Sequence, residues 1–140
     1  MKKYLGIDLG SKTIGLSISE SGIIAQSYKT FRFLEDDYDE AIKLMVDQIK
    51  NLHIDVVVLG YPKHMNNDVG KRGLISEDVK TKLASLVDAT IVLQDERLST
   101  KSALNAMIAG GTRRNIQKQK KDELAAVVIL QNYLDRKGDH

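Results

Sequence analysis

An unbroken apolar run near the middle of the chain sets the strongest limit on the fold. The segment 54–59 contains Val56-Val57-Val58-Leu59, with no polar residue among these four positions. Because a strand points successive side chains to opposite faces, a strand with this composition is buried on both faces. Such runs are typical of parallel sheets covered by helices on either side. We therefore expect an α/β fold.

The segments around this run predict the order βββαβαβαα. Strands are expected at 4–9, 13–19, about 23–33, 54–59 and 89–93. Helices are expected at about 37–52, 74–87, 100–110 and 122–136, with a loop at 63–73. The first three strands have short connections and predict an antiparallel meander. The alternating elements after them predict a mixed five-stranded sheet with helices on both faces.

Length and composition predict one soluble domain, residues 1–140. A chain of 140 residues is large enough for a single core, and 42% hydrophobic with 29% charged residues is typical of globular proteins. The absence of cysteine excludes disulfides and thiolate metal sites. No signal peptide or membrane span is expected, because the Met1-Lys2-Lys3 start runs directly into a strand and no long apolar segment follows. We therefore expect a cytoplasmic protein with no membrane partner.

Asp8 is the residue that most strongly indicates chemistry. It stands between Gly6 and Gly10 in a strand whose other face carries leucine and isoleucine. A carboxylate in a strand is costly unless its charge is compensated, and the two glycines allow a ligand or another backbone segment to come close. A divalent cation explains all of these observations. The alternative, an aspartate hydrogen-bonded near a strand end, stays open from this residue alone.

Two further acidic segments join Asp8 in the prediction. Asp95 and Glu96 directly follow a strand, where the carboxyl ends of parallel strands face the ligand crevice of open α/β sheets. Asp122 opens a helix and shares a stripe with Ala125 and Ala126, which allow a close approach to the sheet. The alternatives are an exposed loop with a local Glu–Arg pair for the first segment and a plain helix cap for Asp122.

Carboxylates from two strand ends and a helix suit Mg²⁺ or Mn²⁺, which prefer oxygen ligands. Two such ions about 4 Å apart activate a water and stabilise the leaving oxygen of a phosphodiester. Zinc fits poorly, because cysteine is absent and the three histidines are scattered without ligand spacing.

A basic segment directly before Asp122 indicates a nucleic-acid partner. The residues expected to hold phosphates are Arg97, Arg113, Arg114, Lys118, Lys120 and Lys121. The alternative is an ordinary solvated surface, since the formal net charge is only +2. Aromatic residues make up 5% of the chain, so we expect recognition of backbone or shape rather than base stacking on a broad platform.

Several motifs together resemble a known family. They are Gly6-Ile7-Asp8-Leu9-Gly10-Ser11-Lys12-Thr13-Ile14-Gly15, Gly60-Tyr61-Pro62, Asn66 to Gly70, Asp95-Glu96-Arg97-Leu98-Ser99-Thr100 and Lys121-Asp122-Glu123-Leu124-Ala125-Ala126. Over nearly its whole length the chain resembles the YqgF family, also described as RuvX-like Holliday junction resolvase proteins. The resemblance implies a ribonuclease H-like fold related to RuvC-type resolvases. It also implies a cytoplasmic bacterial nuclease that helps to mature the 5′ end of pre-16S ribosomal RNA.

By position, the resemblance implies that the catalytic and metal-binding acids are Asp8, Glu96 and Asp122, with Asp95 as a further metal ligand. One departure is Tyr61, which stands where the family commonly has leucine and makes the substrate-facing loop less predictable.

Other functions stay open at this point. The substrate is either ribosomal RNA or branched DNA, and a Holliday junction resolvase is the first alternative. A non-catalytic module that binds RNA or the ribosome is the second. A sugar-kinase or actin-like phosphotransferase shares the Gly-x-Asp-x-Gly motif but generally needs a second domain, for which 140 residues leave no room. The number of metal ions and the choice between monomer and homodimer are also open.

Overall fold

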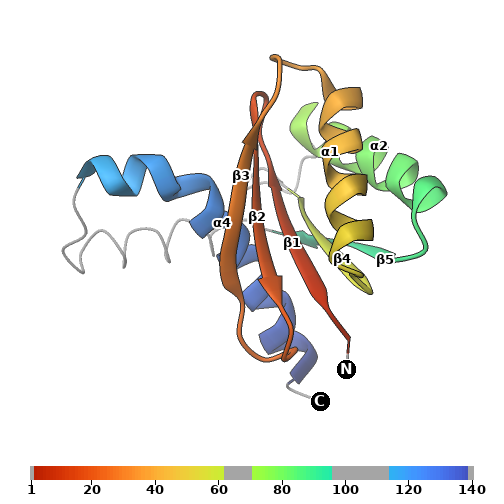
Figure 1. Cartoon of the computed structure of the whole chain (residues 1–140), viewed down its shortest axis with the longest axis vertical. Coiled ribbons are helices and arrows are strands. Elements are labelled where there is room, and N and C mark those ends of the chain that lie inside the picture. Colours follow the sequence, from red (N-terminus) through yellow and green to blue (C-terminus); the bar gives the residue numbers. More distant parts are fainter. Residues whose placement is uncertain (1, 62–70, 96–113, 139–140) are drawn as a thin grey trace.

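The computed structural model describes residues 2–61, 71–95 and 114–138, and at 71–72, 95, 114–123 and 138 it describes only the backbone (Figure 1). The strands are β1 (Tyr4–Leu9), β2 (Thr13–Ser19), β3 (Gln26–Arg32), β4 (Val56–Tyr61) and β5 (Thr90–Asp95). The helices are α1 (Tyr38–Asn51), α2 (Lys71–Leu86) and α4 (Arg114–Gly138). The helix expected at about 100–110 lies outside the described residues. Within these ranges, no helix combines the length and apolarity that crossing a bilayer requires.

The strands form one five-stranded sheet in the order β3-β2-β1-β4-β5. Antiparallel pairing joins β1 to β2 and β2 to β3, as expected for a meander. Parallel pairing joins β1 to β4 and β4 to β5. The predicted mixed sheet is confirmed.

Helices cover both faces of this sheet, with α1 and α2 on one side and α4 on the other (Figure 1). Side chains of β4 alternate between the two resulting cores. Val57 and Leu59 belong to the core on the α1/α2 side, whereas Val56 and Val58 pack in the core on the α4 side. All of β4 is buried, which confirms the expectation drawn from its unbroken apolar run.

The edge strand β3 begins at Gln26, three residues later than expected. Gly22 has a φ of 76°, in the left-handed region that glycine adopts without cost. The Ser21 hydroxyl oxygen accepts hydrogen bonds from the backbone N–H groups of Ile23 (3.1 Å) and Ile24 (3.2 Å). These donors therefore serve a turn instead of the β2–β3 ladder.

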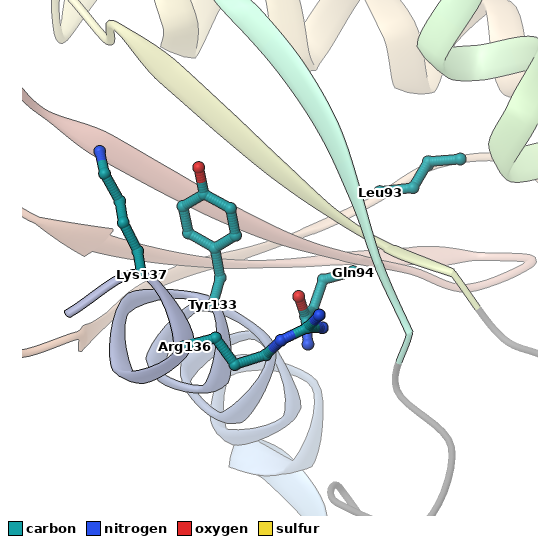
Figure 2. Close-up of a pocket in the computed structure, with 5 residues that line it drawn as sticks. All are labelled: Leu93, Gln94, Tyr133, Arg136 and Lys137. Carbon is teal, nitrogen blue, oxygen red and sulfur yellow. The ribbon is translucent and has the colours of Figure 1, made fainter. Parts of the chain in front are cut away.

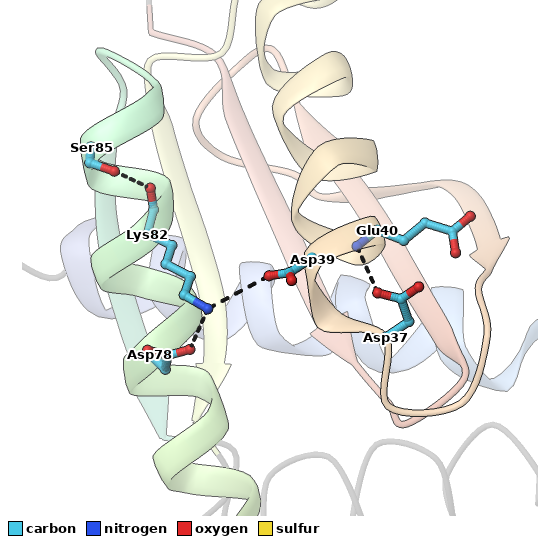
Figure 3. Close-up of polar contacts among 6 residues, drawn as sticks. All are labelled: Asp37, Asp39, Glu40, Asp78, Lys82 and Ser85. Atoms are coloured by element: carbon cyan, nitrogen blue, oxygen red, sulfur yellow. Dashed lines mark hydrogen bonds and ion pairs between the residues drawn. The ribbon is translucent and has the colours of Figure 1, made fainter.

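Helix α1 begins where the sequence places its cap. The Asp37 carboxylate accepts the Glu40 N–H at 3.3 Å, and Lys82 of α2 forms ion pairs with Asp39 (3.7 Å) and Asp78 (3.1 Å) (Figure 3). The two carboxylates raise the pKa of Lys82, with the Asp78 hydrogen bond as the largest cause. These pairs are exposed, so they orient α1 and α2 more than they stabilise them.

The prediction that the last helix begins near Asp122 is wrong by two helical turns. Helix α4 begins at Arg114, and the basic segment 114–121 is its first part. The physical reason is propensity, because arginine, lysine and glutamine are good helix formers and the segment contains no glycine or proline. Helix α2 likewise begins at Lys71, three residues earlier than expected.

Candidate active site

Asp8 lies on the α4 side of the sheet, near the carboxyl end of β1. Along this strand Ile7 points into the core on the α1/α2 side, so its neighbours point the other way. A side chain at Gly6 would meet Ala126 and Leu130 of α4, which places that position under the helix. Asp8 follows two residues later on the same face and is half-buried.

Glycine occupies the positions around Asp8 on this face. Gly6 and Gly10 lie two residues before and two residues after it along the chain. Across the β1–β2 ladder the partner of Asp8 is Gly15. The sequence argument identified the first two glycines and missed the third, which only the pairing of strands reveals.

A fourth glycine lies on the other side of Asp8. The pairing of Ile7 with Leu59 puts the next residue of β4, Gly60, level with Asp8. Gly60 in turn pairs with Gln94 of β5, which is buried. A row of positions therefore crosses the sheet through Asp8, and the strand position between Asp8 and Gln94 is a glycine.

The same row reaches the opposite edge of the sheet at Thr30. Thr30 pairs with Gly15 across the β2–β3 ladder. Its Oγ1 is buried, and within the described part of the chain it has no hydrogen-bond partner. A buried hydroxyl is costly when it lacks a hydrogen-bond partner.

Helix α4 runs antiparallel to β1 and is held tightly against it. The Ser17 hydroxyl of β2 donates a buried hydrogen bond of 2.7 Å to the Ala126 carbonyl oxygen. Near the other end of the helix, the Tyr133 ring packs on Tyr4 at 6.2 Å between centroids, and Lys137 Nζ donates to the Tyr4 hydroxyl at 2.6 Å. The helix thus spans β1 from its first residue to the glycines around Asp8.

The other predicted site residues fall at or beyond the limits of what the structure describes. Asp95 ends β5, and Asp122 lies within α4, but their side chains are not among those described. Glu96, Arg97 and Arg113 lie outside the described residues. The remaining basic residues lie in the first part of α4, also without described side chains: Arg114, Lys118, Lys120 and Lys121.

The donor chemistry of this region fits Mg²⁺ or Mn²⁺. The described side chains alone contain no cluster of three or more histidine or acidic groups suited to a metal ion. Asp8 supplies one carboxylate, and glycine stands beside it at positions 10, 15 and 60, whereas Ser17 and α4 fill the space above Gly6. With no cysteine in the chain, the available ligands are oxygen and imidazole groups, and oxygen is the ligand that these ions prefer.

Tyr61, the departure from the family pattern, is buried at the end of β4. Its hydroxyl donates to the Glu77 carboxylate of α2, and burial, followed by this carboxylate, raises the pKa of Tyr61. The neighbouring Gly60 carbonyl oxygen accepts a 3.2 Å hydrogen bond from the Ser76 hydroxyl of α2. Tyr61 therefore anchors β4 to α2, on the sheet face opposite Asp8.

Comparison with known proteins gives a consistent result. The family model RuvX, described as Holliday junction resolvase, matches residues 2–136. A protein of Onion yellows phytoplasma named "Putative pre-16S rRNA nuclease" is 46% identical over 132 residues, which cover 94% of this chain and 87% of that protein. A protein of the same name from Bacillus subtilis is 41% identical over 134 residues, covering 95% and 97%.

A solved structure shares the fold. RuvC of T. thermophilus, in complex with a Holliday junction substrate, superposes with a TM-score of 0.63 over 99% of this chain and 97% of that one. The sequence identity is 13%, so the likeness concerns the ribonuclease H-like fold alone.

Proposed function

This chain belongs to the RuvX family, and we propose that it is a metal-dependent endonuclease that hydrolyses phosphodiester bonds of structured nucleic acid. The favoured substrate is the 5′ end of pre-16S rRNA, processed in the cytoplasm during ribosome biogenesis by one nuclease domain spanning residues 1–140. The observation that carries the proposal is Asp8, a half-buried carboxylate whose neighbouring positions across both strand ladders are Gly15 and Gly60. Glycines at neighbouring positions suit a carboxylate that a bound ligand approaches closely.

The register of α4 supports Asp122 as a second acid. Gly6 lies under Ala126, and Asp122 precedes Ala126 by four residues. Two strand residues advance by about 6.6 Å, and four helix residues advance by about 6 Å. Because the helix is antiparallel to β1, the step from Gly6 to Asp8 matches the step from Ala126 to Asp122.

Alternation along β5 supports Glu96 over Asp95 as the third acid. Val92 packs on the α4 side of the sheet, whereas Ile91 packs on the α1/α2 side. Even-numbered positions of β5 therefore share the face of Asp8. Position 95, the last of β5, is odd-numbered, so Asp95 is the weaker candidate and Glu96 is proposed as the third acid.

Asp8, Glu96 and Asp122 would hold Mg²⁺ or Mn²⁺ between them. In a phosphodiester hydrolase such ions lower the pKa of an attacking water and stabilise the leaving oxygen. The chain's own contribution is to fix its acids on a rigid sheet and a helix packed against it. The basic residues around them (Arg97, Arg113, Arg114, Lys118, Lys120 and Lys121) would hold phosphates near these acids.

The test compares Asp8→Asn with Asp47→Asn, a matched change at an exposed position of α1. Purified wild-type protein is expected to cut pre-16S rRNA in the presence of Mg²⁺ or Mn²⁺ and not in EDTA. Asp8→Asn is expected to lose at least about a hundredfold in rate, as when one group essential to the transition state is removed. Equal cleavage by both variants refutes the assignment of Asp8.

The family model's description favours branched DNA as a second candidate substrate. A synthetic four-way junction assayed beside the RNA distinguishes the two, and faster metal-dependent cutting of the junction favours a resolvase. The cellular arm sequences precursor rRNA ends after depletion of the protein and rescue by wild type or Asp8→Asn. Rescue by both variants, with no cleavage in vitro by either, indicates a non-catalytic RNA-binding or ribosome-binding module.

A further inference from the structure

A groove of about 380 Å³ lies between the last strand of the sheet and the C-terminal part of α4 (Figure 2). Its lining residues are Leu93, Gln94, Tyr133, Arg136 and Lys137. These described lining residues supply two cations, one aromatic ring and one amide, and none of them carries a carboxylate. None of them belongs to the basic set of the proposed function.

We propose that this groove binds the nucleic-acid strand that flanks the bond cut at Asp8. The inference rests on the proposed function for its substrate class. Arg136 and Lys137 supply charge for phosphates, Tyr133 supplies a ring beside a sugar or base, and Gln94 supplies an amide at the floor. Figure 2 shows Arg136 extending from α4 toward Gln94, so the two elements meet across the groove.

Two side chains of the α4 wall, Tyr133 and Lys137, are held by contacts with Tyr4 of β1. Lys137 Nζ donates to the Tyr4 hydroxyl at 2.6 Å and stands 5.0 Å from the centre of the Tyr4 ring. The Tyr133 ring packs on the same tyrosine with an interplanar angle of 50°. The hydrogen bond to Tyr4 is the main cause that raises the pKa of Lys137, so the amine stays charged at neutral pH. A wall held in this way loses little side-chain entropy when a phosphate binds.

Strand register relates the groove to Asp8. Gln94 and Asp8 stand in the same row, with only Gly60 between them. Two strand spacings amount to about 10 Å. That distance corresponds to about three nucleotide rises along one strand of a duplex, at about 3.4 Å each. A strand whose phosphate sits at Asp8 therefore reaches the groove a few nucleotides away.

A second groove on the described surface lacks these properties and supplies a control. It has about 390 Å³ and lies at the amino ends of β4 and β5, with Lys50, His53 and Asp88 among its lining residues. The negative charge of Asp88 offsets the positive charge of Lys50 in this groove. This groove lies at the opposite end of the strands from the carboxyl end of β1.

The binding test uses a fluorescein-labelled single-stranded RNA of about 12 nucleotides and anisotropy at several salt concentrations. Arg136→Gln is expected to weaken binding about tenfold, the usual effect of losing one charged contact. It is also expected to reduce the slope of log K against log salt by about 0.7, the value for one phosphate contact on a single strand. Lys50→Gln removes the same charge from the second groove and is expected to leave both quantities unchanged.

Two further measurements separate this inference from the proposed function. In the cleavage assay Arg136→Gln is expected to raise KM while kcat stays within about twofold, because the groove contributes binding equally to ground and transition states. Lys137→Gln provides a second variant, with circular dichroism as the check on folding. If both variants fold and keep the wild-type affinity and salt slope, the groove does not bind nucleic acid, even when the protein still cleaves its substrate. Weakened binding in a protein that cuts no substrate supports the groove and refutes the nuclease.

Discussion

Replacing Gly6 by alanine tests how closely α4 must approach the sheet. A Cβ at this position would lie 2.3 Å from Ser17 Oγ, 2.7 Å from Leu130 Cβ and 2.9 Å from the Ala126 carbonyl oxygen. All three distances are shorter than ordinary van der Waals contact, and two of the atoms belong to α4. Serine can rotate away, but the helix backbone can yield only by moving as a body.

The cost follows from two contributions. Overpacking a filled core position costs about 1–3 kcal/mol. Rotating Ser17 away breaks its buried 2.7 Å hydrogen bond to Ala126, which adds about 1 kcal/mol. We therefore expect Gly6→Ala to lower the free energy of unfolding by about 2–4 kcal/mol, a large share of the stability of a small domain.

Urea unfolding followed by circular dichroism measures this free energy, with the m-value as a check on two-state behaviour. The matched control is Ser17→Ala, which removes the nearest clashing atom together with its hydrogen bond. The loss of stability measured for the double variant should be smaller than the sum of the losses in the two single variants, because that sum counts the serine contact twice. A loss below about 0.5 kcal/mol in Gly6→Ala, the level of an ordinary surface substitution, refutes the close packing of α4 on β1.

The remaining predictions concern two polar groups. Thr30→Val removes, at nearly constant volume, a buried hydroxyl that has no hydrogen-bond partner among the described residues. It is expected to raise the free energy of unfolding, measured in urea, by about 1 kcal/mol, whereas a loss of stability shows that the hydroxyl has a partner. Tyr61→Phe removes the hydrogen bond to Glu77 and is expected to destabilise the protein at neutral pH. Folding raises the pKa of Tyr61 above 10.0, so the stability that its hydroxyl contributes is complete below pH 10 and is lost as the pH rises through the raised pKa. The difference in unfolding free energy between wild type and Tyr61→Phe, measured in urea, should therefore become smaller above pH 10. A difference that grows there contradicts this reasoning.

Local pattern predicted much of the fold. The bounds of β1 and β2 were predicted correctly, because alternation and flanking turn residues mark both strands. The apolar run correctly predicted a strand buried on both faces. The start of α4 was misplaced because a run of positive charge at 114–121 was interpreted as a surface segment, although its residue types favour helix.

The candidate site was only partly accessible from the sequence. Asp8 could be singled out because its glycine neighbours lie nearby in the chain. Gly15 and Gly60 come to it through strand register, which depends on long-range pairing and leaves no local signal. The groove was missed for a similar reason. Arg136 near a helix C-terminus is common for its favourable interaction with the helix dipole, and its neighbour Gln94 comes from a distant strand.

The position of α4 in the chain has a consequence for synthesis on the ribosome. The sheet face that carries Tyr4, Val56 and Val58 is covered by residues 125–137, which emerge after every strand of the sheet. Until then a nascent chain exposes an uncovered apolar layer. We expect such chains to need chaperone protection until α4 has been made and has packed on this face.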